Sequence, residues 1–435
     1  MSLPYLPAGD ELTVAAPVVI PCSSADPHDG GVRLVVSGLV ALLVARQVSA
    51  QAPTPFTYAE ALQRALAANP AIVAAQSRRA MGAAGVAVAG ERLNPEGRVE
   101  FDRDVPHQSY TLAVPLELGG KRGRRIDVAE AEARATDAEI AQLIAETRST
   151  VRRAYYERAS ADARLALLGD LQSIIARARD AARQRFEAGS SPRLELLQAE
   201  LELAQAENES VGARGAATAA RARFNVLLGM SADADTTIVS GDPDAVPVAQ
   251  VALARARQSS AELALFDRRL EAQRARVSLA KAMQKPDLTP EGSFTHGFED
   301  GAEFQNGWKA AVGITLPIFT THKAGVALEE TTLAQLTAER NAADARIAAD
   351  VTAAAVVAEA QRQQVARYRD AIIPQALQVE TMADDAYRLG QTGIAAYLQA
   401  LQATRDVRLR ALQAEADLQL ALADLERAMG APLQP

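Results

Sequence analysis

The chain has 435 residues, a formal net charge of −8 and an aromatic content of only 4%. Few aromatics and many alanines favour closely packed helices over a conventional core of large side chains. Removing the two basic and four acidic residues of positions 1–50 leaves 44 basic against 50 acidic residues, which is mildly acidic. This balance excludes the basic surface that phosphate neutralisation needs, so we expect no nucleic-acid partner.

The amino terminus has the pattern of an export signal. Arg33 precedes the apolar stretch Leu34–Ala45, and the small residues Val48-Ser49-Ala50 follow, so we predict signal-peptide cleavage near Ala50. The alternative is a transmembrane anchor, but 12 residues fall short of the ~20 that span a bilayer. Residues 1–32 show no periodicity, and a start codon assigned too early would explain them.

Cysteine chemistry is excluded from the predicted mature chain. Cys22 is the only cysteine and lies in the leader, in the context Val19-Ile20-Pro21, which is a poor lipidation signal. We therefore expect no disulfide, thiolate metal site, cysteine nucleophile or lipid anchor after cleavage.

Two halves of the chain repeat each other. Phe186-Glu187-Ala188-Gly189 recurs as Tyr387-Arg388-Leu389-Gly390, an offset of 390 − 189 = 201 residues, and Leu228-Gly229 recurs as Met429-Gly430 at the same offset. A step this long is a duplicated domain-sized block and not a solenoid unit. We assign residues 51–235 to the first repeat, 236–250 to a linker and 251–435 to the second repeat.

Each repeat contains two short runs typical of strands. In 110–118 and 308–318 large apolar residues occupy alternate positions, which gives each run one apolar face. Weaker partner strands contain Val99 and Phe101 in the first repeat, and Phe294 and Phe298 in the second. The predicted apolar strand positions are Tyr110, Leu112, Val114, Leu116, Trp308, Val312, Ile314 and Leu316.

Glycines mark the predicted turn from strand to helix. Gly119-Gly120-Lys121-Arg122-Gly123 and, in the second repeat, Gly325 occupy this position. The run lacks the spacing of a phosphate-binding loop, so we interpret it as a turn, with Lys121, Arg122, Arg124 and Arg125 at a membrane interface.

Very long helices follow the turns. We predict helices over 124–187 and 323–388, interrupted only by Gly169, Gly325 and Pro374, and ~60 residues would extend ~90 Å. Periodicity alone favours an ordinary coiled coil. The predicted apolar stripe comprises Ile140, Leu143, Ile144, Thr147, Val151, Ala154 and Tyr155, and the predicted polar positions are Arg148, Arg152, Arg153, Glu157 and Arg158.

Helix reversals are predicted after each long helix. Gly189 suits the left-handed conformation that ends a helix, Ser191 can cap the next helix, and Pro192 and Glu195 fit its first turn. Gly390, Thr392 and Gly393 play the same part in the second repeat. Capping alone accounts for these residues unless their place at a tip gives them a further role.

The strands have the 9–11 residues that cross an outer membrane. Four strands cannot close a barrel, and an open edge in lipid would leave backbone groups unpaired. Several copies must therefore share one barrel, with the long helices extending to one side.

The ordered motifs resemble the TolC-type outer-membrane efflux channels over residues 56–430. Phe56-Thr57-Tyr58-Ala59-Glu60-Ala61-Leu62 with Asn69-Pro70 is similar to the family's opening helix, and Leu316-Pro317-Ile318-Phe319 through Gly325 to its common second-repeat form. Asn94-Pro95-Glu96 and the segment from Val114 to Gly123 resemble the heavy-metal cation branch associated with Czc-type and Cus-type pumps.

This resemblance implies a mainly α fold with a small β part, built from a duplicated helix-strand-strand-long helix-helix repeat. It implies a homotrimer with four strands per protomer in one transmembrane β-barrel, continued by an α-helical barrel in the periplasm. Such a protein is a passive duct in the outer membrane and works with a periplasmic adaptor and an inner-membrane pump of the resistance-nodulation-division class. Residues implied at the adaptor contact and gate are Gly189, Ser190, Ser191, Pro192, Glu195, Gly390, Gln391, Thr392, Gly393 and Gln399.

The acidic ring that closes the tip in well-known family members is missing here, because Ala396 and Gln399 stand at the matching positions. Glu195 is our substitute candidate, since three carboxylates around a narrow axis would attract cations and raise one another's pKa. The simpler interpretation is that Glu195 only favours a helix start.

Catalytic and metal-binding patterns are weak. His107, His296 and His322 have no partner at ligand spacing, so we expect no metal site and no cofactor. No paired-carboxylate or Ser-His-Asp arrangement supports an enzyme. The preferred function is therefore a metal-cation efflux duct; the alternatives are a drug, solvent or polypeptide duct of the same family, or an exported structural coiled coil without a pore.

Overall fold

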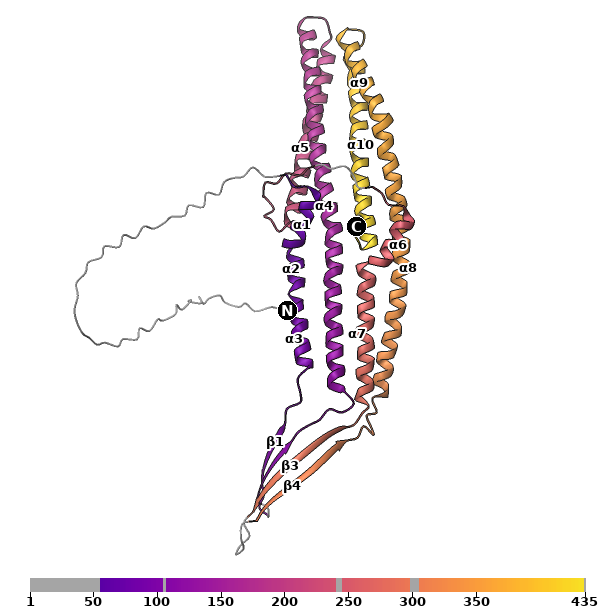
Figure 1. The fold of residues 1–435 in the computed structure, drawn as a ribbon. Helices are drawn as coiled ribbons and strands as arrows, with labels where there is room; N and C mark the ends of the chain where they lie inside the picture. Colours follow the sequence, from indigo (N-terminus) through magenta and orange to yellow (C-terminus); the bar gives the residue numbers. More distant parts are fainter. Residues whose placement is uncertain (1–54, 105–106, 240–244, 298–304, 434–435) are drawn as a thin grey trace, which may run out of the picture. The chain divides into compact units, whose positions relative to one another are not determined.

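The computed structural model describes residues 55–104, 107–239, 245–297 and 305–433. The predicted leader at 1–50, its Cys22 and the predicted strand residue Phe298 lie outside the described residues. The described part contains both predicted repeats and is ordered as helices, two strands, a long helix and a returning helix, twice. The mainly α fold with a small β part is thereby confirmed (Figure 1).

The elements of each repeat are bounded as follows. In the first repeat they are α1 (Tyr58–Ala68), α2 (Pro70–Gln76), α3 (Arg78–Ala89), β1 (Glu96–Phe101), β2 (Gln108–Ala113), α4 (Lys121–Glu187) and α5 (Arg193–Leu227). In the second they are α6 (Ala249–Ser259), α7 (Ala261–Met283), β3 (Asp287–Gly297), β4 (Gln305–Thr315), α8 (Lys323–Arg367), the π-helix η1 (Tyr368–Ile372), α9 (Ile373–Arg388) and α10 (Ile394–Met429).

Helix α4 has 67 residues, so it extends roughly 100 Å. It packs along α5 and α7, while α8 packs along α10 and α7, and α10 also contacts α4. These contacts join the two repeats along their helices. In Figure 1 the α4–α5 and α9–α10 reversals lie at the end of the helices opposite to the strands.

The four strands form one antiparallel sheet in the order β1-β2-β3-β4, so the middle pair joins the two repeats. Its register places Val99, Tyr110, Phe294 and Trp308 side by side in one row across all four strands. Because side chains alternate between faces, this row and the rows two residues away share one face of the sheet.

Two strand boundaries differ from the prediction. Strand β2 ends at Ala113 and β4 at Thr315, so Val114, Leu116 and Leu316 lie beyond the strands. Pro115 and Pro317 explain the early ends, because proline has no N–H to donate to a ladder. Pairing with β3 nevertheless continues locally: the Val114 N–H donates to the Pro290 carbonyl at 3.0 Å, and Leu116 bridges to Leu288.

The start of α4 and the place of Gly325 also differ from the prediction, whereas α8 begins at Lys323 as predicted. Helix α4 begins at Lys121, so Lys121, Arg122 and Gly123 belong to its first turn and not to the connecting turn. Gly119 and Gly120 make that turn, with φ of 70° and 74° in the left-handed region that glycine tolerates. Gly325 likewise lies inside α8, where His322 precedes the helix with a φ of 55°.

The second long helix is interrupted where the first is continuous. Residues Tyr368–Ile372 form a π-helix between α8 and α9, directly before Pro374. Proline cannot donate to the carbonyl four residues earlier and its ring crowds that carbonyl, so a locally wider turn relieves both problems. Sequence periodicity gave no sign of this break beyond Pro374 itself.

The predicted polar positions of α4 include two that are buried, which corrects the prediction. Arg152 is 3% exposed and its Nε donates to Glu426 of α10 at 2.9 Å. Arg158 is 2% exposed and donates to the Thr236 hydroxyl at 2.7 Å and to its carbonyl. Both guanidinium groups are buried because distant acceptors satisfy them.

Candidate functional site

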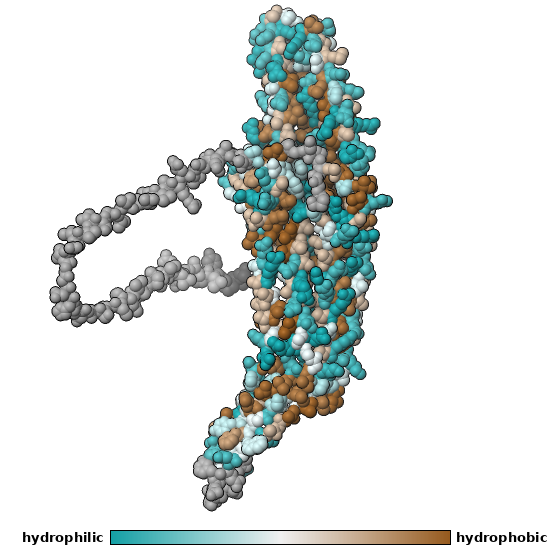
Figure 2. All heavy atoms as spheres, in the orientation of Figure 1, coloured by the Kyte–Doolittle hydropathy of each residue, from teal (hydrophilic) through white to brown (hydrophobic). Residues whose placement is uncertain are grey.

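One face of the sheet is apolar and exposed in the single chain. Trp308 is 84% exposed, and Val99, Tyr110 and Phe294 of the same row are also exposed. The apolar surface continues beyond β4, where Phe319 is 99% exposed. Further exposed members are Phe101, Leu112, Leu116, Val312, Ile314, Leu316 and Ile318. In Figure 2 brown side chains gather where the strands join the helices. A continuous apolar surface of this kind indicates contact with a membrane or another protein.

The opposite face of the sheet is polar. One of its rows contains Glu96, Ala113, Glu291 and Ala311, and the next contains Arg98, Thr111, Ser293 and Lys309. A sheet with one apolar and one polar face separates two media, and the polar side suits water. This confirms the predicted alternation of strand faces.

The basic segment at the strand-to-helix turn clamps the junction. Lys121 Nζ lies 2.6 Å from Asp287 Oδ2 at the start of β3, and the Leu118 N–H donates to the same carboxylate at 3.1 Å. Lys121 is only 5% exposed, so its charge is directed to Asp287 and not to the surface. Gly119 is needed here as well, because a Cβ at this position would stand 2.6 Å from the Lys285 side chain.

Two further arginines of this segment fasten the end of α3. Arg122 Nε donates to the Gly90 carbonyl at 2.7 Å, and Arg125 donates to the Glu91 carbonyl at 3.1 Å while pairing with Glu117. The motif that resembles the heavy-metal branch therefore holds α3, β2, β3 and α4 in fixed relation. It is a structural clamp of the place where the sheet meets the helices.

The two reversals have matching backbones. Gly189 and Gly390 both adopt a φ of 71°, as the predicted chain reversal requires. The predicted cap differs: the N-cap of α5 is Pro192, not Ser191, and it makes no side-chain capping bond. Gly393 is the N-cap of α10. Ser190 closes the first reversal, since its hydroxyl donates to the Arg185 carbonyl at 2.8 Å.

The two hairpin tips pack against each other within one chain. Tyr387 and Ile394 of the second hairpin are buried in a cluster with Ile175, Ala182 and Ala199 of the first. The remaining buried members of this cluster are Ala178, Ala206, Tyr397, Leu398 and Leu401. The tips are thus joined by a small shared core.

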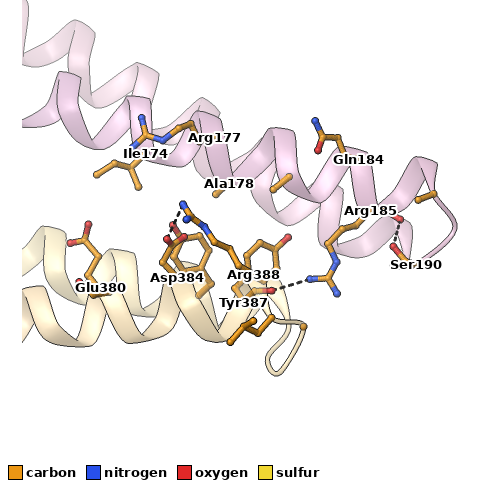
Figure 3. A pocket seen from close by; sticks show the side chains of 16 residues that line it. Ile174, Arg177, Ala178, Gln184, Arg185, Ser190, Glu380, Asp384, Tyr387 and Arg388 are labelled. Atoms are coloured by element: carbon orange, nitrogen blue, oxygen red, sulfur yellow. Dashed lines mark hydrogen bonds and ion pairs between the residues drawn. The ribbon is translucent and has the colours of Figure 1, made fainter.

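A pocket of about 750 Å³ lies between the tips (Figure 3). In Figure 3 Arg185 points from α4 toward Tyr387 on α9, and its Nη1 donates to the Tyr387 carbonyl at 3.5 Å. The same guanidinium lies 5.1 Å from the Tyr387 ring centre. Tyr387 stacks on Tyr397 with ring centres 5.3 Å apart. Arg388 pairs with Asp384 at 3.0 Å on the other side of the pocket.

Burial perturbs both tyrosines of this pocket. It raises the pKa of Tyr397 to about 12, with a further contribution from Asp384. It also raises the pKa of Tyr387, which the nearby Arg185 cation partly opposes and the Glu195 carboxylate reinforces. Both phenols therefore stay neutral across the physiological range.

Glu195 lies at the contact between the tips. Its Oε1 would be 3.6 Å from a Cβ placed on Gly393, so this carboxylate of the first hairpin lies beside the N-cap of α10. The helix N-terminus carries a partial positive charge that favours an anion there. Ala396 and Gln399 are exposed on α10. The sequence did not reveal the contact between Arg185 and Tyr387: Tyr387 was noted only as part of the repeat, and the two residues are 202 positions apart.

Two histidines lie where they were predicted. His296 is in strand β3, and His322 directly precedes α8. His296 Nδ1 lies 2.7 Å from Asn306 Oδ1 on the neighbouring strand. No group of three or more potential metal-ligating side chains occurs among the residues described. Within the same residues, no helix combines the length and the apolarity that crossing a bilayer requires.

A two-faced strand sheet fastened to long paired helices defines the class of outer-membrane channel subunits, and comparison with known proteins agrees. The family profile described as outer membrane efflux protein matches residues 61–230. The nickel and cobalt resistance protein CnrC of Cupriavidus metallidurans is 31% identical over 323 residues, covering 70% of this chain and 73% of that protein. The chain belongs to the outer membrane efflux protein family.

Other relatives support the same assignment. The cobalt-zinc-cadmium resistance protein CzcC of Cupriavidus metallidurans is 27% identical over 281 residues, covering 63% of this chain and 66% of that protein. The chain thus spans about two thirds of that relative's length. The outer-membrane channel OprN matches the fold with a TM-score of 0.70 at 19% identity, covering 87% of this chain and 91% of OprN. The structure of CusC matches the fold with a TM-score of 0.70 at 15% identity, covering 87% of this chain and 93% of the CusC chain.

Proposed function

We propose that the chain is the outer-membrane channel subunit of a tripartite efflux system. The observation that carries this proposal is the sheet with one apolar and one polar face, whose outer strands β1 and β4 are both edges within the chain. In lipid such edges must pair, since unpaired backbone groups are costly there. Copies of the chain supply the pairing, and the resemblance to the family favours three copies around one barrel.

The proposed cargo is heavy-metal cations. Its support is the kinship with proteins named for resistance to cobalt, zinc, cadmium and nickel. A duct needs only weak contact with its cargo, because tight binding would prevent release. Energy would come from an inner-membrane pump through a periplasmic adaptor, and the chain itself would catalyse no reaction. A duct for drugs, solvents or polypeptides is the alternative cargo assignment.

Metal tolerance tests the cargo. A strain lacking this gene should become sensitive to one set among Zn, Co, Cd, Ni, Cu and Ag, and plasmid-borne wild-type gene should restore growth. Loss of drug tolerance with unchanged metal tolerance would replace the cargo but keep the channel.

Membrane insertion tests the class. The wild-type chain should fractionate with the outer membrane as a trimer that dissociates on heating. Val312→Asp puts a charge on the apolar strand face and should abolish insertion, whereas Thr111→Asp, on the polar face, should insert normally. A soluble elongated rod in the periplasm would contradict the proposal and favour a structural coiled coil.

Export and domain boundaries are also part of the proposal. A signal peptide would be removed near Ala50, followed by repeats at 51–235 and 251–435 joined by the linker 236–250. Amino-terminal sequencing of the mature protein should begin close to Gln51, and a start well before it would contradict the cleavage.

We place the adaptor contact and the gate at the two reversals, 189–195 and 390–393, with Gln399 on the adjacent α10 surface. Glu195 would act there by holding the two tips of one chain together beside Gly393. Glu195→Gln removes the charge at constant shape and should raise the open fraction of single channels. The control Glu200→Gln lies five residues further along α5 and removes a carboxylate that pairs with Arg183 within the same hairpin. Equal conductance and gating of both variants would remove Glu195 from the gate.

A further inference from the structure

The charges on the polar face of the sheet are sorted by row, and this order has a consequence for the proposed duct. We define the acidic row as Glu96, Ala113, Glu291 and Ala311, and the basic row as Arg98, Thr111, Ser293 and Lys309. The acidic row lies two residues nearer to the helices along β1. Each row runs unbroken across all four strands, so its position on the wall is fixed by backbone pairing.

The acidic row has two carboxylates and no cation. Glu96 and Glu291 are both exposed, and each flanks Ala113 on a neighbouring strand. Strands are about 4.8 Å apart, so the two carboxylates straddle this alanine within about 10 Å. Within the described residues, neither forms an ion pair. Their charge is therefore available to ions in the water beside this face.

The basic row has the opposite sign but is partly neutralised. Arg98 lies 3.8 Å from Glu100, which belongs to the next row outward and also accepts the Ser109 hydroxyl at 3.3 Å. Lys309, on β4, is exposed and forms no ion pair among the residues described. Among the strand residues of these two outer rows, the uncompensated charge is therefore that of Lys309; the exposed Asp102, Arg103 and Asp104 lie beyond it, after β1.

We propose that Lys309 and the pair Glu96 and Glu291 set the ion preference of the barrel wall along the strands, cation-attracting at the acidic row near the helices and anion-attracting at the basic row. This inference rests on the proposed function, since it needs the polar face to line water. In the assembled barrel every copy repeats the same two rows. Cations leaving the helical tunnel meet the acidic row first, and the Lys309 charge then disfavours their retention at the basic row.

The size of the effect is set by screening. At physiological salt the Debye length is about 8 Å, so these charges act close to the wall and leave the centre of a wide barrel open. A unit charge at about 6 Å in water, screened with this Debye length, changes the local concentration of a monovalent ion about 1.7-fold, so cation and anion differ about threefold. The rows therefore bias which ions accumulate and do not block passage.

The bias can be measured with single cysteines, because residues 51–435 contain no native cysteine. Ser293→Cys lies beside Lys309 in the basic row, and Ala311→Cys lies beside Glu291 in the acidic row. Each trimer, reconstituted in liposomes, is treated from outside with methanethiosulfonate reagents carrying either a trimethylammonium or a sulfonate group. Reagents added from outside reach the barrel directly, so their entry does not depend on whether the tips at the other end of the channel are open.

Each rate is divided by the rate of the same reagent with a small thiol in solution. We expect the normalised rate of the sulfonate reagent to be about threefold higher than that of the cationic one at Ser293→Cys, and the reverse order at Ala311→Cys. Both preferences should shrink in 0.5 M salt. Adding Lys309→Gln to the first variant and Glu291→Gln to the second should remove each preference. Equal rate ratios at the two positions, or ratios insensitive to these neutralisations, would overturn the proposal.

A third cysteine separates this proposal from the proposed function. Val312→Cys lies on the apolar face and should resist both reagents if that face contacts lipid. Rapid modification of Val312→Cys by both reagents would contradict the barrel itself. A protected Val312→Cys together with equal ratios at Ser293→Cys and Ala311→Cys would leave the barrel intact and overturn only the charge sorting.

Discussion

The long helices of the two repeats run the same course but are held differently. Buried positions of α4 at Thr147, Val151, Tyr155 and Arg158 recur 200 residues later in α8 as Ile347, Val351, Ala355 and Ala358. The tips, however, match at 390 − 189 = 201 residues. The extra residue falls in the interval that contains the π-helix η1, and a π-helix is how a helix absorbs one inserted residue.

The packing against α10 differs as well. Helix α4 uses the buried Arg152–Glu426 pair, whereas α8 uses an aliphatic cluster that includes Ile347, Val351, Leu418 and Leu422. A polar contact fixes partner geometry through directed bonds, and an aliphatic one contributes through buried area. Helix α10 is therefore held by two chemistries, polar toward α4 of the first repeat and aliphatic toward α8 of the second.

The largest expected effect comes from breaking the polar contact. Arg152→Ala leaves Glu426 buried without its main partner and should lower the free energy of unfolding by about 3–5 kcal/mol. The double variant Arg152→Met, Glu426→Leu removes both charges and should recover most of this loss. Denaturant unfolding of the purified protein measures both. A double variant as unstable as the single one would contradict the account.

The aliphatic contact should be less costly to weaken. Val351→Ala removes two methyl groups from a fully buried site on α8 and should cost about 2 kcal/mol in the same assay. Val356→Ala makes the same change at an exposed position of the same helix and should change stability little. An equal loss at Val356 would mean that another copy covers it in the assembly.

The π-helix should open more easily than the matching segment of α4. Amide hydrogens of residues 368–372 should exchange about tenfold faster than those of residues 168–172, because π-helical bonding is poorer and Pro374 removes one donor. Hydrogen exchange with mass spectrometry measures this ratio. Pro374→Ala should reduce this ratio of exchange rates. Equal exchange rates in the two segments of the wild-type protein would contradict the expectation.

The two tips should respond alike to loss of their glycines. Gly189→Ala and Gly390→Ala each put a Cβ on a residue with φ of 71° and should each cost about 1 kcal/mol, without a clash. Gly212→Ala, inside α5 with open space around it, should instead stabilise by about 0.5–1 kcal/mol. Destabilisation by all three would point to a general intolerance of alanine and not to backbone strain.

The smallest expected effect concerns an exposed ion pair of α8. Hydrogen bonds from Arg362 and then Gln363 lower the pKa of Glu359 to about 2. A lowered folded pKa means that the contribution is present above the ordinary value of 4.5 and is lost as pH falls toward 2. Glu359→Gln should therefore change unfolding only slightly, and only above that window. A large loss of stability at pH 7 would contradict this, since solvent reaches both side chains of the pair and screens their attraction.

The sequence was sufficient to predict those features of the fold that depend on residues close together in the chain. Alternating residues placed the strands, and Gly189 and Gly390 marked the reversals, because side-chain period and positive φ depend on neighbours in the chain. It failed where the partner is remote: Arg152 needs Glu426, which is 274 residues away, to be buried. Glu195 was placed correctly in a first turn, but its approach to Gly393 depends on tertiary packing.

Trp308 gives the protein a built-in optical probe. It is the only tryptophan in the chain, and it lies on the apolar face of β4, almost fully exposed in a single copy. Its fluorescence would therefore be emitted at long wavelength while that strand is in water and would shift toward the blue when the strand enters lipid. Folding and assembly in a bilayer could then be followed in real time on the unlabelled protein, from a position on the face that enters lipid.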